Sequence, residues 1–481
     1  MREVQIDPMS MERLASVLVP GRSAVLAEAA VHGRDLLAGR TVWNVNSTAS
    51  GGGVAEMLQA LLAYSRGAGV DTRWLVLEAG PDFFALTKRV HNLLHGALGD
   101  GGPTGPDEAA TYQAVMDDQL QELVELVAPG DIVILHDPQT AGLAAGLRDH
   151  GAHVVWRCHV GRDTTNDATD RAWSFLQPYV QAADATIFTR RAYVPAWTDA
   201  DRVWLIPPSL DPFSTKNRPL QHQDVAAALR QAGIVLFADD GGTLEFERRD
   251  GSHGTVRAHP DLQITGGPLP PTARVVLQVS RWDRLKDMAG VLEGFAEHLG
   301  DLPDDVHLML VGPDSAGVSD DPEALEVLAE CEEIWGAQTA EVQARLHLLS
   351  LPMDDVDENA HLVNALQHHA TVVVQKSLAE GFGLTVTEPM WKGRPVVASR
   401  LGGIGDQIVD GDCGLLLDDP TDLDAFMGRV REVLVDDDLA TRLGLAARER
   451  VRDQFLGDRH LRQYVELFEV LLGDPAPPAS G

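Results

Sequence analysis

The sequence predicts an α/β protein made of two domains, each a mostly parallel sheet covered by helices on both faces. Short apolar runs of strand length alternate with helical stretches along the 481 residues. This alternation stops once, near residues 206–209, and then starts again. Most of the runs are apolar throughout, as expected for strands that helices bury on both sides. Two such series predict two doubly wound domains.

The first series predicts a domain over residues 1–207. Its helices are expected to include residues 54–65 and 112–127, which separate strands in the order of a βα repeat. The expected strands are residues 41–46, 73–77, 131–136, 152–158, 184–188 and 203–206.

The break between the two series coincides with Pro207 and Pro208. Two prolines remove two amide donors and favour an extended chain, which suits a linker. The second domain is predicted over residues 208–473, with a polar insertion at about 238–267, and residues 474–481 are predicted to be a disordered tail. Alternation in residues 243–246 and 255–258 allows a small hairpin in the insertion. The expected strands of the second series are residues 274–280, 306–311, 346–351, 371–375, 395–399 and 414–417.

The charge balance and the cysteines narrow the class of protein. Lysine and arginine number 39 against 72 acidic residues, so the net charge is 39 − 72 = −33. A field of this sign opposes binding to nucleic acid or anionic membranes. No apolar run approaches the ~18 residues of a membrane span, and the three cysteines form no CxxC pair. We therefore expect a reduced, cytoplasmic protein. The acidic pairs lie in scattered turns and predict no metal site.

A run of glycines, Gly51, Gly52 and Gly53, follows the first expected strand and opens a helix. Glycines let the backbone approach a ligand closely, and the free amides of a helix N-terminus attract anions. The spacing is neither a dinucleotide fingerprint nor a P-loop. Taken alone, the run fits a tight turn without a ligand equally well.

Two cations follow the first strand of the second series. Arg281 and Lys286 lie five residues apart, at the end of a strand where open α/β sheets bind ligands. A guanidinium fork and an ammonium suit a diphosphate. A close charge pair gains about 4 kcal/mol at 4 Å and an effective dielectric of 20, whereas distant surface acids are screened. The net charge therefore does not exclude such a site, although a surface loop with salt bridges is the alternative interpretation.

The run EGFGLTVTE at residues 380–388 is the most specific motif. The carboxylates of Glu380 and Glu388 bracket a glycine loop that leads into a helix. Gly381 and Gly383 can offer backbone amides to a phosphate or sugar oxygen, and carboxylates accept hydrogen bonds from paired sugar hydroxyls. Alone, Glu388 could simply interact with the helix dipole.

These residues resemble the retaining GT-B glycosyltransferases of family four. Residues 380–388 look like the family's E-x7-E motif, and Arg281 and Lys286 match its donor-diphosphate pair. The likeness is closest to the glycosyltransferring trehalose synthases and the related trehalose phosphorylases. It covers about residues 31–468, with the 238–267 insertion outside it. The segments that carry the closer likeness are residues 46–58, 83–92, 136–139, 156–159, 375–377 and 389–393.

The resemblance implies a role for each matching residue. Arg281 and Lys286 would hold the donor diphosphate, Glu388 the ribose hydroxyls and Glu380 the hydroxyls of the transferred sugar. The donor-binding set that it implies is Gly51, Gly52, Gly53, Arg281, Lys286, Glu380, Gly381, Phe382, Gly383, Leu384, Thr385 and Glu388. His159 would face the donor sugar, so the implied catalytic set is His159, Glu380, Arg281 and Lys286.

The acceptor side is implied by fewer residues. Lys88, Arg89 and Asp137 are the acceptor-binding candidates. Val160 and Gly161 follow His159 where these synthases usually carry an Ile-Asp pair, which places the acceptor contacts in question. Arg284 and Leu285 likewise replace the more usual Pro-Trp before Lys286.

The implied activity is retaining transfer of glucose from a nucleoside-diphosphate glucose to glucose, which gives trehalose. The resemblance implies that the two domains face a central cleft and that transfer needs no metal or other cofactor. The expected partners are a nucleotide-sugar donor and a small sugar acceptor, without nucleic acid or membrane, and a homodimer is compatible with the sequence. The donor base stays open among ADP, UDP and GDP.

Three other functions are compatible with part of the sequence. The same fold with other substrates would give a trehalose phosphorylase, or a family-four transferase that acts on another polyol or natural product. A non-catalytic sensor of sugar nucleotides would keep the donor motif without turnover. A sugar-nucleotide epimerase would need a dinucleotide fingerprint and a Tyr-x-x-x-Lys pair, and the sequence contains neither.

Overall fold

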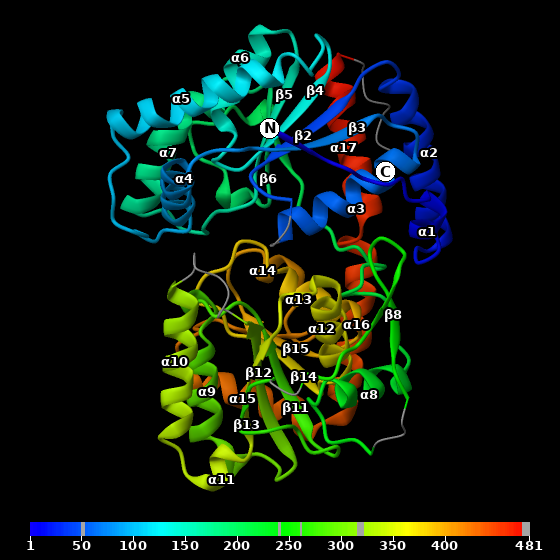
Figure 1. Ribbon diagram of the computed structural model, residues 1–481, viewed down its shortest axis with the longest axis vertical. Coiled ribbons are helices and arrows are strands. Elements are labelled where there is room, and N and C mark those ends of the chain that lie inside the picture. Colours follow the sequence, from blue (N-terminus) through cyan, green and yellow to red (C-terminus); the bar gives the residue numbers. More distant parts are fainter. Residues whose placement is uncertain (50–52, 239–241, 260–261, 315–321, 474–481) are drawn as a thin grey trace. The chain divides into compact units, whose positions relative to one another are not determined.

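The computed structural model describes residues 1–49, 53–238, 242–259, 262–314 and 322–473 (Figure 1). The chain forms two compact units. The first comprises Met1–Leu210 together with Asp453–Gly481, and the second comprises Asp211–Arg452. Each unit is an α/β domain with its own seven-stranded sheet.

The sheet of the first unit has the strand order β1-β3-β2-β4-β5-β6-β7. All neighbours pair in parallel except β1, which runs antiparallel to β3 at one edge. The strand order reverses between β2 and β4, which lie side by side although β3 comes between them in the sequence. The strands are β1 (Arg2–Val4), β2 (Val42–Asn46), β3 (Thr72–Val76), β4 (Ile132–His136), β5 (His153–Cys158), β6 (Ala185–Phe188) and β7 (Val203–Leu205).

Helices cover both faces of this sheet. Alternate strand residues such as Trp43 and Leu135 pack with α4, α5, α6 and α7 on one face. Their neighbours, such as Val42 and Ile134, pack with α3 and α17 on the other. The helices of the unit are α1 (Met11–Ala15), α2 (Pro20–Leu36), α3 (Gly53–Gly67), α4 (Pro81–Leu94), α5 (Pro106–Leu123), α6 (Ala144–Asp149), α7 (Asp167–Val180) and α17 (Gly457–Leu472), with short 3-10 turns at Ala141–Leu143, Arg191–Tyr193 and Ala200–Arg202.

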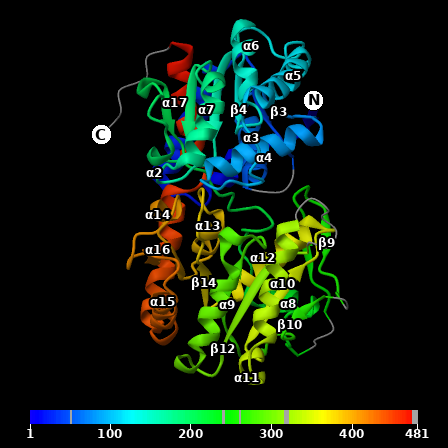
Figure 2. The ribbon, with the colours of Figure 1, turned by 90° about the vertical axis from the view of Figure 1, so that its left-hand side faces the viewer.

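The last helix returns to the first unit, which differs from the division expected from the sequence. Residues 453–473 were assigned to the second domain, but α17 lies against α2 and α3 (Figures 1 and 2). The Arg157 guanidinium, which is 1% exposed, donates to His460 Nε2 and Tyr464 Oη, both at 2.6 Å. Helix α17 thus completes the core around a sheet whose last strand lies about 250 residues earlier in the sequence. The chain crosses from the first unit to the second after Leu210, three residues beyond the expected boundary.

The sheet of the second unit has the order β10-β13-β12-β11-β14-β15-β16. Six of its strands pair in parallel with one another, and β10 pairs antiparallel with β13 at the edge. The order reverses between β11 and β14. The strands are β10 (Ile264–Thr265), β11 (Arg274–Val279), β12 (Val306–Pro313), β13 (Leu346–Leu351), β14 (Val372–Gln375), β15 (Val396–Ser399) and β16 (Leu415–Leu417).

Helices also cover both faces of the second sheet. Strand residues such as Val276 and Leu308 pack with α9, α10 and α15 on one face, and α12 and α13 contact strands from the other. The helices are α8 (His222–Gln231), α9 (Met288–Glu297), α10 (Pro322–Gly336), α11 (Ala340–Gln343), α12 (Val356–His369), α13 (Leu384–Trp391), α14 (Ile404–Gln407), α15 (Leu423–Val435) and α16 (Asp437–Gln454), with 3-10 turns at Arg284–Lys286 and Leu299–Asp301.

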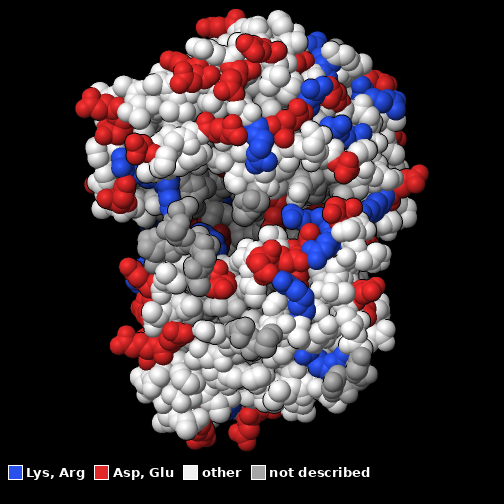
Figure 3. Space-filling view, in the orientation of Figure 1, with Lys and Arg blue, Asp and Glu red and all other residues white. Residues whose placement is uncertain are grey.

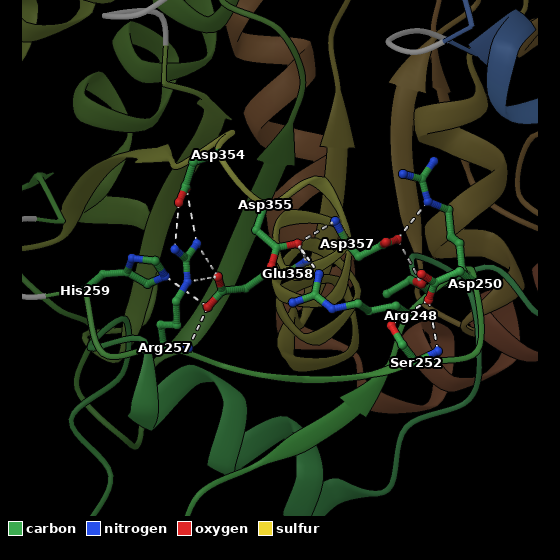
Figure 4. A network of polar contacts seen from close by, with 11 residues as sticks. Arg248, Asp250, Ser252, Arg257, His259, Asp354, Asp355, Asp357 and Glu358 are labelled. Carbon is green, nitrogen blue, oxygen red and sulfur yellow. Dashed lines mark hydrogen bonds and ion pairs between the residues drawn. The ribbon is translucent and has the colours of Figure 1, made fainter.

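The polar insertion forms the small hairpin that its alternation allowed. Strand β8 (Glu245–Glu247) pairs antiparallel with β9 (His253–Thr255). Ion pairs attach the insertion to the start of α12 (Figure 4). They join Arg248 to Asp355 at 2.6 Å, Arg249 to Asp357 at 2.8 Å and Arg257 to Asp354 at 2.6 Å, and Arg257 also contacts the buried Glu358.

Both predicted series of strands are confirmed. Each of the twelve strands expected from the sequence overlaps an observed parallel strand, and the helices expected at 54–65 and 112–127 correspond to α3 and α5. The tail predicted to be disordered, residues 474–481, lies outside the described residues. Acidic side chains are spread over both units on the face shown in Figure 3, with basic ones between them.

Candidate active site

The strand ends at the reversal of the second sheet bring the predicted donor residues together. Lys286 follows β11, Glu380 follows β14, and these strands are neighbours. Lys286 Nζ lies 2.5 Å from Glu380 Oε2, and the two side chains are only 13% and 11% exposed. The amide of Gln278, a fully buried residue, donates to the Lys286 carbonyl at 2.8 Å and holds the loop in place. The crevice at such a reversal is where open α/β sheets bind ligands.

Arg281 lies in the same loop but points to solvent. Its side chain is 67% exposed and forms an ion pair with Asp283 at 2.8 Å. The next residue, Trp282, is buried, and its indole nitrogen donates to the Pro313 carbonyl at 3.1 Å. Trp282 therefore anchors the loop, and the Arg281 guanidinium has room to reach an anion.

The glycine loop is held in place from behind. Gly383 has φ of 87° and precedes α13, and a Cβ there would lie 3.0 Å from Ile404 Cγ1. The buried Gln407 amide donates to the carbonyls of Phe382 at 2.5 Å and Gly383 at 3.2 Å. These contacts use the loop's carbonyls and leave the start of α13, with its amide dipoles, on the ligand side.

The remaining motif residues surround this helix start. Gly381 accepts a hydrogen bond from the Gly403 amide at 2.9 Å, and Leu384 opens the helix. In the described part of the chain, the hydroxyl of Thr385 is buried without a hydrogen-bond partner. The Thr385 hydroxyl is therefore a polar group near the helix start that makes no hydrogen bond to the described residues.

Glu388 is enclosed by polar side chains. It is 5% exposed, its carboxylate accepts from Gln367 Nε2 at 3.2 Å, and Lys216 Nζ lies 3.5 Å away. One turn later, Lys392 donates to Gln367 Oε1 at 2.7 Å. Burial lowers the pKa of Lys392 to about 7, although the charge of Glu388 opposes this shift. Glu388 is thus oriented by a buried polar cluster.

Lysines concentrate in this unit. Four of the five lysines of the chain belong to it. Besides Lys216, Lys286 and Lys392, the buried Lys376 contacts the carboxylate of Asp287 and the Pro420 carbonyl. Asp287 adopts φ of 51° and caps α9. Four of the five ammonium groups of a chain with a net charge of −33 therefore belong to the unit that carries the predicted diphosphate site.

In the first unit, Asp137 and His159 lie at the carboxyl ends of two neighbouring parallel strands, β4 and β5. Asp137 follows β4 with φ of 63°, and its carboxylate accepts from the His159 amide at 2.8 Å. Its own amide donates to the Arg157 carbonyl at 2.8 Å. Burial raises the pKa of Asp137 to about 7, against the opposing effects of the His159 amide and the Arg157 charge. Asp137 therefore joins the ends of β4 and β5.

His159 is linked to a second histidine. Its Nε2 lies 3.0 Å from Nδ1 of His136, and Nε2 of His136 lies 3.1 Å from Oδ1 of Asn44. Asn44 and His136 are each 1% exposed and His159 is 8% exposed. Burial, followed by the nearby Arg157 charge, lowers the pKa of both imidazoles well below the ordinary value. His159 is therefore a neutral group.

The other predicted residues of this unit are less closely grouped. Lys88 is exposed on α4. Arg89 pairs with Asp100 at 2.6 Å and donates to the Pro103 carbonyl at 2.6 Å, and the Asp100 contact raises the pKa of Arg89. Its contacts thus stabilise the loop after α4 instead of joining it to Asp137. Gly53 begins α3, whereas Gly51 and Gly52 lie outside the described residues. That residues of both units meet across one cleft stays a prediction.

Comparison with known proteins gives the family. Residues 44–195 match the family described as "Trehalose synthase, N-terminal domain", and residues 263–450 match "Glycosyl transferases group 1". A trehalose synthase from Rubrobacter xylanophilus is 35% identical over 443 residues, covering 91% of this chain and 92% of that protein. One from Pyrococcus horikoshii is 31% identical over 437 residues, covering 91% of each chain.

The chain belongs to the trehalose synthase family of glycosyltransferases. A trehalose phosphorylase from Pleurotus pulmonarius is more distant, at 26% identity over 438 residues, and the chain spans 54% of its length. The resemblance inferred from residues 380–388 and the trehalose synthase motifs is thereby confirmed.

Solved structures give the fold of this trehalose synthase family member. One described as "Trehalose-6-phosphate from E. coli bound with UDP-2-fluoro glucose" has a TM-score of 0.65 at 14% identity, covering 91% of this chain and 100% of that chain. A sucrose-phosphate synthase from Thermosynechococcus elongatus has a TM-score of 0.62 at 19% identity, with the same coverage. The predicted GT-B type of fold is confirmed.

Residues 196–262 lie between the two family matches. They contain most of the insertion that attaches to α12, so neither match includes this part of the insertion. No metal-binding group of three or more His, Cys, Asp or Glu side chains occurs among the described residues. Among the same residues, no helix is long and apolar enough to cross a membrane.

Sequence reasoning found the charged strand ends but missed the groups that hold them. Gln407, Gln367 and Lys216 support the glycine loop and Glu388, yet each lies 21 or more residues in the sequence from the group it supports. Asn44 left a signal that was overlooked, because an amide side chain within a strand buried on both faces needs a partner.

Proposed function

We propose that this chain is a retaining glucosyltransferase that moves glucose from a nucleoside-diphosphate glucose to glucose and forms trehalose. The observation that carries the proposal is the paired Lys286 and Glu380 beside the glycine loop, at the reversal of the second sheet. A cation for the diphosphate and a carboxylate for the sugar lie there next to each other. The membership of the trehalose synthase family supports the choice of sugar.

The donor would bind with its diphosphate on Lys286, the exposed Arg281 and the amides at the start of α13. The unpartnered Thr385 hydroxyl would contact a donor oxygen. Glu388, oriented by Gln367 and Lys216, would accept the ribose hydroxyls. Preorganised cations and dipoles stabilise charge that develops on a leaving group, so these groups would lower the barrier to departure of the diphosphate.

The reaction would proceed on one face of the donor sugar. Glu380 would hold hydroxyls of the transferred glucose, and His159 would face the same sugar from the first unit. The acceptor hydroxyl would attack the anomeric carbon from the face that the diphosphate leaves, so the α configuration is retained. As the bond to the diphosphate breaks, the leaving phosphate would take the proton of the acceptor hydroxyl. No protein nucleophile is part of the proposal.

A phosphorylase is the second candidate because trehalose phosphorylases from Pleurotus are related to this chain. The chain spans 92% of the Rubrobacter synthase but 54% of the Pleurotus phosphorylase, which favours the synthase. Incubation of trehalose with either phosphate or a nucleoside diphosphate separates the two. A synthase consumes trehalose only with the nucleoside diphosphate, and a phosphorylase only with phosphate.

A screen of ADP-, UDP- and GDP-glucose with glucose tests the proposal and identifies the donor base. We expect release of nucleoside diphosphate and equimolar trehalose with at least one donor. The Arg281→Ala/Lys286→Ala variant is the control, and it should retain its fold and lose turnover. Donor binding without turnover would instead identify a sugar-nucleotide sensor and would overturn the proposal.

A further inference from the structure

Three buried polar side chains of the first unit form a continuous chain of hydrogen bonds that ends at His159. Asn44 lies in β2, His136 ends β4, and His159 follows β5. The contacts are 3.1 Å from Asn44 Oδ1 to His136 Nε2 and 3.0 Å from His136 Nδ1 to His159 Nε2. The two imidazole rings stack with an angle of 13° between their planes.

The direction of each hydrogen bond follows from the one before it. A neutral imidazole has one nitrogen that donates and one that accepts, and burial keeps both histidines neutral. The Asn44 carbonyl oxygen can only accept, so His136 Nε2 carries the proton and its Nδ1 accepts. His159 must then donate from Nε2, which leaves its Nδ1 as a bare acceptor.

We propose that Asn44 is a positioning residue that fixes the tautomer of His159 through His136, so that His159 Nδ1 accepts a hydrogen bond from a hydroxyl of the donor sugar. The proposal deepens the proposed function and rests on it for the identity of that hydroxyl. Which imidazole nitrogen carries the proton is set by the bond that the other nitrogen makes. Asn44 would therefore act on the reaction without contacting a substrate.

Burying the Asn44 side chain lowers the stability of the protein, whereas an apolar side chain at the same position would not. The amide faces a cavity lined largely by apolar side chains, among them Leu62 and Ile134. Among the described residues, nothing partners the amide nitrogen of Asn44. An unsatisfied buried polar group costs about 1–3 kcal/mol, so an apolar residue of the same size would fit this position at least as well. Stability and function therefore separate at Asn44.

The test is NMR of the full chain labelled with 15N-histidine, without substrates, in which His159→Gln assigns the His159 signals. We expect His159 to carry its proton on Nε2. Asn44→Leu removes the oxygen that accepts from His136 Nε2, so this nitrogen is left without a partner. An unprotonated nitrogen is less costly to bury unpaired than an N–H group. His136 then moves its proton to Nδ1 and donates to His159, whose proton moves to Nδ1. Asn44→Asp keeps an acceptor oxygen and should keep the original tautomer.

Turnover gives the functional half of the test. The kcat of Asn44→Leu should fall about tenfold or more, as when a group that orients a functional imidazole is lost. The donor KM should change by less than about twofold, because the contact matters most in the transition state. Thr72→Val is the matched control. Thr72 lines the same cavity and donates to the Val42 carbonyl at 3.0 Å, so this variant should lose stability with kcat and tautomer unchanged.

Two results would overturn the inference. One is a wild-type His159 with its proton on Nδ1, and the other is an Asn44→Leu variant that keeps the proton on Nε2. A switched tautomer with unchanged kcat would refute the catalytic consequence. A wild-type chain that transfers no glucose would refute the proposed function, whereas the tautomer measurement, which uses no substrate, would stand separately.

Discussion

Replacing Glu380 by glutamine should tighten the binding of a free nucleoside diphosphate while it slows transfer. The Glu380 carboxylate lies 2.5 Å from the Lys286 ammonium. It therefore neutralises the cation that the diphosphate needs, and it also repels the phosphate oxygens. Glu380→Gln keeps the shape and a hydrogen-bond acceptor but removes the charge. The gain in diphosphate affinity and the loss of the sugar contact should then appear as opposite effects in one variant.

The expected magnitude follows from the geometry. Two unit charges about 5 Å apart at an effective dielectric of 20 interact by about 3 kcal/mol. The Glu380 and Lys286 side chains are still 11% and 13% exposed, and the diphosphate can shift away from the carboxylate. We therefore expect about one third of that energy as the net gain in binding free energy, so the Kd for the nucleoside diphosphate should fall about fivefold. The gain should shrink at high salt, because screening weakens it.

Calorimetric titration with ADP, UDP and GDP at two salt concentrations measures the effect. Asp283→Asn is the matched control, because Asp283 pairs with Arg281, whose side chain is 67% exposed. An exposed pair contributes only about 0–1 kcal/mol, so this variant should change the Kd by less than Glu380→Gln does. Folded Glu380→Gln with an unchanged or weaker affinity would refute the electrostatic interpretation of the pair.

Three further predictions concern the loop, the pH response and the last helix. Gly383→Ala forces a side chain into φ of 87° and against Ile404, so it should cost about 1–2 kcal/mol and weaken donor binding. Gly393→Ala, at φ of 71° with its nearest neighbour atom at 3.6 Å, should cost stability without affecting the donor, as denaturant unfolding and calorimetry would show. Between its unfolded pKa of about 3.9 and its folded pKa of about 7, Asp137 is protonated only in the native state. Its contribution to stability is therefore complete below about pH 4 and is lost as the pH rises through 7. Asp137→Asn should remove about 2 kcal/mol of that loss between pH 5 and pH 8. Free energies of unfolding in urea that fall equally with pH in both proteins would contradict this. Deletion of residues 457–481 should unfold the first unit, because α17 supplies part of its core, and a cooperative far-UV melt of residues 1–210 alone would contradict it.

The sequence predicted the parts of the fold that depend on neighbouring residues. Apolar runs such as 131–136 and 346–351 identify strands, because a strand covered on both faces must be apolar along its whole length. The charged residues directly after those strands then fall at one edge of each sheet. This reasoning places Lys286 and Glu380 at the same edge, and the pairing of β11 with β14 in the structure brings them into contact.

The position of α17 could not be predicted in this way. Its apolar face, with Leu467 and Phe468, shows that it packs on something but not on which of two similar sheets. The deciding contacts come from Arg157 in β5, some 300 residues away. The linker predicted from Pro207 and Pro208 accounts for one crossing between the units, and these residues give no sign of the return.

The residues that support the site could not be predicted from the sequence for a related reason. Gln407 and Gln367 carry no charge, and their roles depend on carbonyl and carboxylate partners in other elements. The enclosure of Glu388 could not be foreseen because its partner Lys216 lies before the insertion. Arg89, which the resemblance assigns to the acceptor, pairs with Asp100 in the structure, and its contact with an acceptor stays a prediction.

NMR of the product from nucleoside-diphosphate glucose and 13C-labelled glucose tests the central claim most directly. Retention and attack by the anomeric hydroxyl predict one disaccharide with two equivalent α-anomeric positions, one labelled and one unlabelled, and no free reducing end. A β-anomeric signal would contradict retention. A product that keeps a reducing end would contradict the formation of trehalose.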